Sequence, residues 1–188
     1  LAKLSESLQI KESSAFSPQD KHLYHESRKV LLQYQDLVAA RFIETLATAL
    51  PLQDGAAGGS AGAPRRLDHL SLDDLELMDD SQVHETVEQG RVLQIVKMAV
   101  DEDLVTFNAL LSSARELAVV RPDANPLRPD VLVQSLMRAL ETLHVDPAIR
   151  SNWFHCGAVA LGQEVQQLYQ DLSTWLMSQG VQPAGYVV

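Results

Sequence analysis

A long, regular seam of small and apolar residues is the feature that most constrains how this chain can fold. The seam spans 35 residues in ten steps of three or four, at Val83, Val87, Gly90, Leu93, Val96, Val100, Leu104, Phe107, Leu111, Ala114 and Ala118. An average step of 3.5 residues keeps all of these side chains on one face of an α-helix, whereas a strand would alternate with a period of two. The sequence therefore predicts a helix over residues 80–119 that packs through this seam.

The segments before the seam divide at a proline and at a glycine-rich run. Residues 1–17 mix Ser, Lys, Glu and Gln without a sustained period, so we expect a flexible arm. Ser17 followed by Pro18 is a helix start, because the hydroxyl caps the first turn and proline lacks an N–H that would be unpaired there. One long helix is predicted over residues 18–50, with an inner face at Leu23, Ser27, Val30, Tyr34, Leu37, Arg41 or Phe42, and Leu46.

Residues 51–66 are rich in Gly, Ala, Ser and Pro, which offer little to bury, so they are predicted to be a flexible linker. Such a linker leaves two arrangements open. The preceding helix can pack on its own domain, or it can be exchanged with a second copy of the chain.

The remaining residues, 67–188, are predicted to form the core of a helical bundle. Pro122 and Pro126 prevent any helix from continuing through them, and Pro129 opens a helix that ends near His144. A last helix is predicted over residues 147–179, where Asp146 and Pro147 form a second cap-and-proline start and Gly180 stops the helix. No segment alternates with a period of two, so the fold class is all-α: one domain, a bundle of about five helices, with residues 80–119 and 147–179 as its two long members.

Charge and composition exclude several kinds of partner. Residues 1–66 carry a net charge of +1 and residues 67–188 a net charge of −11. An acidic field repels phosphate backbones and anionic lipid, so neither nucleic acid nor a membrane is expected as a partner. Cys156 is the single cysteine and no apolar run approaches the length of a membrane span, so we expect a soluble protein of a reducing cytoplasm.

The last predicted helix has few charges. After Arg150 only Glu164 and Asp171 are charged, and Gln163, Gln166, Gln167 and Gln170 supply the polar face. A helix of this composition is often covered on several sides, either inside its own domain or at an interface. The small residues Cys156, Gly157, Ala158, Ala160 and Gly162 also predict that another helix approaches closely, with Trp153 and Phe154 packing alongside.

Two carboxylate and imidazole pairs have metal-ligand spacing. Glu141 and His144 are three residues apart, as in di-iron bundles, but such sites need a second copy of the pair and the chain has none. His84 and Glu88 are one helical turn apart, but the second histidine of the zinc-protease motif is missing. We therefore interpret both pairs as solvated surface groups, and we assign no metal ligands.

The other candidates also favour structural interpretations. The acidic run at 72–80 lacks the glycine and the terminal glutamate of a calcium loop, and the glycine-rich run at 55–62 lacks the context of a phosphate loop. Arg65 and Arg66 could hold an anion but are also ordinary solubilising residues. His155 and Cys156 point about 100° apart on a helix, so they do not form a base and nucleophile pair, and Cys156 is predicted to be a core residue. No catalytic residue and no cofactor is assigned.

Several of these segments together carry a family resemblance. The run LSLDDLELMDDSQVHETVEQGRV, then FNALLSSA, the turn NPLRPDVLVQSL and the ending LYQDLSTWLMSQGVQP resemble the N-terminal portion of a bacterial family known as domain of unknown function 1631 (DUF1631). The resemblance covers residues 67–184 and extends much less clearly to residues 1–66. It implies a cytoplasmic bacterial protein without established activity, although some members carry a thymidine phosphorylase label. Members are much longer, and the chain starts at Leu1, so we expect a piece of a larger protein.

These observations predict a non-catalytic helical module for protein–protein interaction or dimerisation, with a homodimer or the rest of its own longer chain as the expected partner. The alternative is a ligand-binding or enzymatic domain that acts on nucleosides. That alternative predicts a concave pocket lined by charged residues from several helices.

Overall fold

The computed structural model describes the backbone of residues 1–50 and 80–185, and the side chains of all of these except 80–85. The predicted linker at 51–66 and most of the acidic run that follows it lie outside the described residues. Over the described ranges the chain is all-α, with five α-helices, one short 3-10 turn and no strand. The elements are α1 (Ala2–Ser14), α2 (Pro18–Ala49), α4 (Asp80–Ala114), η2 (Pro122–Ala124), α5 (Pro129–Glu141) and α6 (Pro147–Ser178).

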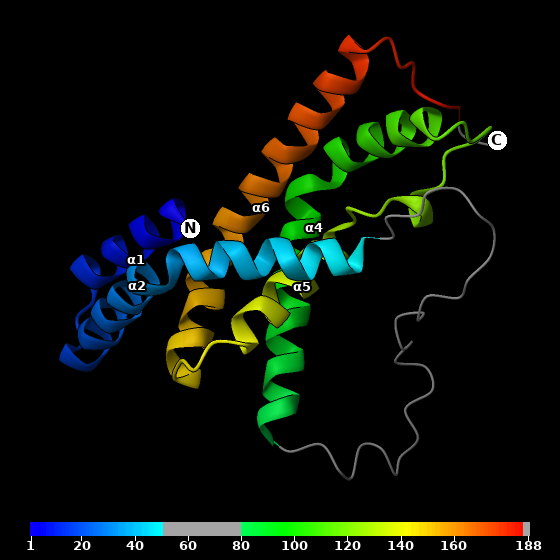
Figure 1. Ribbon diagram of the computed structural model, residues 1–188. Helices are drawn as coiled ribbons and strands as arrows, with labels where there is room; N and C mark the ends of the chain where they lie inside the picture. The colour runs from blue at the N-terminus through cyan, green and yellow to red at the C-terminus, as the bar shows by residue number, and fades with distance from the viewer. Residues whose placement is uncertain (51–79, 186–188) are drawn as a thin grey trace.

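Helices α4 and α6 lie side by side and run in the same direction, and they form the spine of the fold (Figure 1). Their contacts keep one register: Gln166 donates to Asp103 at 2.8 Å, and the rings of Phe107 and Tyr169 stack with centroids 5.1 Å apart. At Gly162 an added Cβ would lie 2.9 Å from the Cβ of Ala99. The predicted close approach at the small residues of α6 is therefore confirmed, since only glycine fits there.

The seam on α4 is buried in its middle and exposed at its ends. Val96 and Val100 have 0% exposure and Phe107 has 2%, whereas Val87 is 64% exposed. The helix also ends at Ala114, five residues before the predicted boundary. The cause is Glu116, which adopts φ 58°, a left-handed conformation that closes the helix through a bond from Leu117 N–H to the Ser112 carbonyl.

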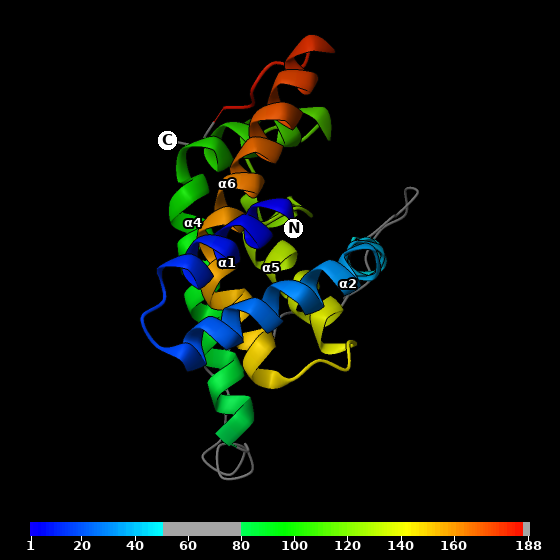
Figure 2. The same ribbon diagram turned by 90° about the vertical axis from the view of Figure 1, so that its left-hand side faces the viewer.

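The predicted long helix after Ser17 is confirmed as α2, which crosses α5 and α6 of the same chain (Figure 2). The hydroxyl of Ser17 accepts from Gln19 N–H at 3.2 Å, as the capping signal predicted. Within its predicted inner face Ser27 is fully buried, but Leu37 is 42% exposed. Leu31 and Val38 are buried instead, because the helix turns these residues toward α5 and α6. At 32 residues α2 is as long as α6, so the bundle has three long helices rather than two.

The prediction that residues 1–17 form a flexible arm is wrong. Residues 2–14 form α1, which lies across α6 and against α2 (Figure 2). Leu8 has 0% exposure and is part of the core, and Leu4 packs against it. These few apolar side chains give α1 too weak a period to be recognised in the sequence. The helix is stabilised by its tertiary contacts rather than by its own amphipathicity.

The turn before α5 is fixed by a buried polar network. Asn125 has 1% exposure, and its amide group donates to the side chain of Asn108 at 2.8 Å while its oxygen accepts from Leu127 N–H at 2.8 Å. The hydroxyl of Tyr169 donates to the Leu127 carbonyl at 2.6 Å. These bonds join α4, the turn and α6, so the Asn-Pro-Leu turn has a structural role: it holds the two helices together.

The end of α6 follows the predicted stop signal. Gly180 adopts φ 83°, and Val181 N–H bonds to the Leu176 carbonyl at 3.1 Å, a glycine-terminated helix end. The chain then returns to the end of α4, where Ala184 N–H bonds to the Ala109 carbonyl at 3.0 Å (Figure 1).

Candidate functional site

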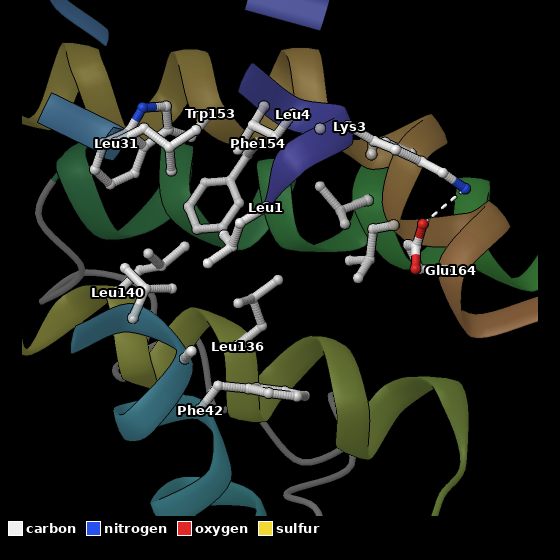
Figure 3. Close-up of a pocket in the computed structure, with 17 residues that line it drawn as sticks. Leu1, Lys3, Leu4, Leu31, Phe42, Leu136, Leu140, Trp153, Phe154 and Glu164 are labelled. Carbon is white, nitrogen blue, oxygen red and sulfur yellow. Dashed lines mark ion pairs between the residues drawn. The ribbon is translucent and has the colours of Figure 1, made fainter. Parts of the chain in front are cut away.

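An apolar cavity of about 310 Å³ lies where the helices meet beneath α1 (Figure 3). All five described α-helices contribute to its wall. The aliphatic and aromatic members of the wall are Leu1, Leu4, Leu31, Val38, Ala39, Phe42, Val92, Leu136, Leu140, Trp153, Phe154, Ala158, Ala160 and Leu161. The indole N–H of Trp153 already donates a hydrogen bond to the Ser27 carbonyl, at 2.8 Å, and does not offer a donor to the cavity. The interior of the cavity therefore favours aliphatic or aromatic groups over polar ones.

One charged pair stands at the edge of the cavity. The ammonium of Lys3, on α1, lies 2.6 Å from a carboxylate oxygen of Glu164, on α6, at one end of the cavity (Figure 3). The hydrogen bond from Lys3 lowers the pKa of Glu164 below its ordinary value, and burial opposes the change. Both side chains are about half exposed, at 49% and 56%, so water screens the pair and its contribution to stability is small.

The run of small residues on α6 that lets α4 approach at Gly162 also lets α1 approach, at Gly157. A Cβ on Gly157 would lie 3.2 Å from a terminal methyl group of Leu4. Leu4 therefore rests on a bare stretch of α6 backbone and forms part of the cavity roof together with Leu1. The roof depends on a helix with a single fully buried side chain, Leu8.

Beyond the cavity, the face of α6 that α1 covers becomes exposed. Leu161 lines the cavity, and Leu168, Leu172 and Trp175 follow at steps of seven, four and three, which places them on one face of the helix. Leu168 is 37% exposed and Trp175 is 58% exposed, while Leu172 is half-buried. We call Leu168, Leu172 and Trp175 the α6 stripe. An exposed tryptophan beside leucines is typical of contact surfaces between proteins.

The structure does not bring the predicted metal-ligand candidates together. Helix α5 ends at Glu141, so His144 lies beyond the helix, and both residues are exposed. Glu88 instead accepts a hydrogen bond from the hydroxyl of Ser151 on α6, and the side chain of His84 lies outside the described residues. Arg65, Arg66 and nearly all of the acidic run also lie outside them. Among the described side chains, no three His, Cys, Asp or Glu residues gather as a metal site would require.

The interpretation of Cys156 as a packing residue agrees with its surroundings. The thiol is half-buried, packs against the core and contacts the side-chain oxygen of Asn152 at 3.4 Å. Burial raises its pKa above the ordinary value, with Lys11 opposing the change, so the group is a thiol rather than a nucleophilic thiolate near neutral pH. His155 points elsewhere, to Arg91 on α4, with 3.2 Å between the two nitrogens.

The sequence did not predict the cavity. A few of its wall residues, such as Phe42, Trp153 and Phe154, were predicted to pack inside the bundle, but unfilled volume depends on how five helices meet. The one available signal was the run of small residues at 156–162, which predicted close approach by one helix. The structure has two such approaches on this run, by α4 at Gly162 and by α1 at Gly157.

Comparison with known proteins identifies one family. The family model described as "Protein of unknown function (DUF1631) N-terminal domain" matches residues 1–180. The match includes the first 66 residues, which resemble the family much less clearly by inspection. No curated protein and no solved structure matches the chain. None of the described helices is long and apolar enough to cross a membrane.

Proposed function

The chain belongs to the DUF1631 family, whose N-terminal domain it carries, and from this premise we propose that it is a non-catalytic helical module that associates with a second copy of itself through the α6 stripe. The observation that supports this most directly is Trp175, a large aromatic side chain left 58% exposed on a regular helix. Tryptophan is enriched among the residues that dominate the free energy of binding at protein interfaces.

The chemistry of α6 favours a second copy as the partner. From Ser151 to Ser178 the helix carries two charges, Glu164 and Asp171, and four glutamines. A two-fold interface places the same surface on both sides, so a strongly charged surface would repel its copy. The three side chains of the α6 stripe are uncharged and can meet their copies without such repulsion, and of the two carboxylates beside the stripe, Glu164 and Asp171, the first is paired with Lys3.

The candidate site gives less support to a nucleoside or phosphate site. Phosphate binding requires cations or converging N–H groups. Among the side chains of the cavity wall Lys3 is the one cation, and it is already paired with Glu164. The cavity also differs from the pocket lined by charged residues that the enzymatic alternative predicts.

We further propose that the domain works in a bacterial cytoplasm. The free thiol of Cys156 is consistent with a reducing compartment, as is the lack of any second cysteine in the sequence.

Sedimentation equilibrium over a micromolar concentration range tests the proposal. We expect the mass to rise from 20.7 kDa toward twice that value as concentration increases. Trp175→Ser should shift the dissociation constant by at least about tenfold, as expected for a tryptophan that anchors an interface.

The matched control is Met177→Ser. Met177 is 51% exposed, close to the value for Trp175, but it lies two residues further on and therefore on another face of α6. This variant should associate like the unmodified chain. A chain that stays monomeric throughout, or two variants that weaken association equally, would contradict the proposal.

A further inference from the structure

The cavity beneath α1 has the size and the wall of a small-molecule site. Its volume of about 310 Å³ is at the lower end of the range of roughly 300–1,000 Å³ found for ligand pockets. A water molecule inside would need two or more polar partners, and the aliphatic and aromatic wall offers them only at the edge. An aliphatic group is therefore the occupant that fits the interior best.

The polar groups of the wall are at one end. Figure 3 shows Lys3 and Glu164 paired at that end, while Leu31, Leu140 and Trp153 lie at the opposite end. An amphiphilic molecule can place its chain along the apolar walls with its head beside the pair. The pair offers N–H donors from Lys3 and acceptor oxygens from Glu164, and its two charges cancel.

The balance of charge selects the kind of head group. An anionic head would meet Glu164 and a chain whose net charge is −10, and a cationic head would compete with Lys3 for its carboxylate. An uncharged head such as a hydroxyl can donate to Glu164 and accept from Lys3 without breaking the pair.

The cavity is partly open to solvent, and only a small part of the fold covers it. The roof consists of Leu1 and Leu4, on or beside the first turn of α1. Leu4 rests on Gly157, where no side chain interlocks with it. The first turn of α1 is therefore held to α6 by the contact of Leu4 and by the pair of Lys3 and Glu164, while Leu8 keeps the rest of the helix in the core.

We propose that this cavity binds a single aliphatic chain that bears an uncharged polar head, with the chain along the apolar wall and the head at Lys3 and Glu164. This site is separate from the α6 stripe and does not depend on self-association.

A fluorescence titration with 1-decanol tests the proposal. Trp153 lines the cavity and is 2% exposed, whereas Trp175 does not line it, and the chain has two tryptophans. Trp175→Phe therefore leaves Trp153 as the sole indole reporter. We expect a saturable change in Trp153 emission at one ligand per chain.

Two neighbouring alanines of α2 provide the test variant and its matched control, both made in the Trp175→Phe chain. Ala39 and Ala40 are both exposed, but only Ala39 lines the cavity. Ala39→Leu should weaken 1-decanol binding by roughly tenfold or more, since its added carbons compete for the space of the chain. Ala40→Leu should leave binding unchanged.

Two further probes with the same chain test the head group. Decanoate and decylammonium should both bind more weakly than 1-decanol. Tighter binding of either ion would overturn the assignment of an uncharged head. No saturable change with any of the three probes, or equal effects of Ala39→Leu and Ala40→Leu, would overturn the site itself. Sedimentation of the unmodified chain, which keeps Trp175, reports self-association separately, so failure of one proposal is distinguishable from failure of the other.

Discussion

Two segments are attached to the α4 and α6 pair by different kinds of interaction: the turn before α5 by buried hydrogen bonds, and α1 by apolar contacts and an exposed ion pair. Toward the C-terminal ends of α4 and α6 a buried network of Asn108, Asn125 and Tyr169 joins both helices to the turn before α5, and we call this the tied end. Toward the N-terminal part of α6 the same pair borders the cavity, with α1 resting above it, and we call this the roofed end. Directed hydrogen bonds specify one geometry, whereas apolar contacts around unfilled volume tolerate small shifts.

This difference indicates which end stabilises the fold and which end can adapt to a ligand. At the tied end Tyr169 has 0% exposure, and burial raises its pKa, so its hydroxyl stays protonated and continues to donate to the Leu127 carbonyl. At the roofed end α1 meets α6 through a polar contact, the screened pair of Lys3 and Glu164. Helix α2 is held to α6 there by buried hydrogen bonds from Asn152 and Trp153 to Ser27, so the weakly attached element is α1. The turn at the tied end therefore preserves the fold, and α1 at the roofed end is the part that can change to admit a ligand.

Asn125→Ala, at the tied end, should cause the largest loss of stability. The substitution removes two hydrogen bonds and leaves the Asn108 side chain and Leu127 N–H without their partner in a buried region. We expect the free energy of unfolding to fall by about 3 kcal/mol, measured by urea denaturation. Asp123→Ala, at an exposed position of the same turn, is the control and should change it by less than about 0.5 kcal/mol. Equal effects of the two substitutions would mean that the buried network does not stabilise the turn.

A pair of glycine substitutions on α6 compares the two ends directly. Gly162→Ala forces a Cβ to within 2.9 Å of Ala99, so α4 and α6 must separate, and we expect a loss of about 2 kcal/mol. Gly157→Ala meets only a terminal methyl group of Leu4, which can rotate away. Because alanine favours the helix over glycine by about 1 kcal/mol, this second variant should be neutral or more stable. Thermal unfolding of both variants checks the order, and a larger loss at Gly157 would contradict it.

Filling the cavity should stabilise the roofed end. Ala160 lines the cavity, and Ala160→Leu adds aliphatic atoms to unfilled space. We expect the free energy of unfolding to rise by about 1 kcal/mol. The control is Ala148→Leu, at an exposed position in the first turn of the same helix, which should have little effect. A clear destabilisation by Ala160→Leu alone would indicate that the space is already filled.

The smallest effect concerns the ion pair at the edge of the cavity. Because the folded-state pKa of Glu164 is lowered, its contribution is present above the ordinary pKa of glutamate and is lost as pH falls through the lowered value. Glu164→Gln should therefore cost less than about 1 kcal/mol at neutral pH and nothing in strong acid. Urea denaturation as a function of pH measures this, with Glu102→Gln as an exposed control. A cost that grows toward acid pH would contradict the assignment.

The sequence predicted those elements whose signals are local. Ser17 with Pro18 and Asp146 with Pro147 set two helix starts, and Gly180 set a helix end, because capping depends on neighbouring residues. The end of α4 was missed because Glu116 takes a conformation that its residue type does not favour. Helix α1 was missed because it is stabilised by contacts with α2 and α6, which leave little trace in its own sequence.

The candidate site was less predictable than the fold. The α6 stripe and the cavity wall consist of leucines, alanines and aromatic residues that look alike whether they are buried, exposed or beside unfilled space. Their exposure depends on where α1 begins and how far it extends along α6. The glycines were the exception, since a helix with two bare positions indicates that something lies close to it.

Native-state hydrogen exchange with and without 1-decanol tests the central claim most directly, that the roofed end can open while the tied end stays fixed. Without ligand, amides of α1 should exchange much faster than those of α6 around Tyr169. With 1-decanol, exchange in α1 should slow while exchange near Tyr169 stays unchanged. Uniform exchange in both regions, or protection by the ligand at the tied end instead, would contradict the account.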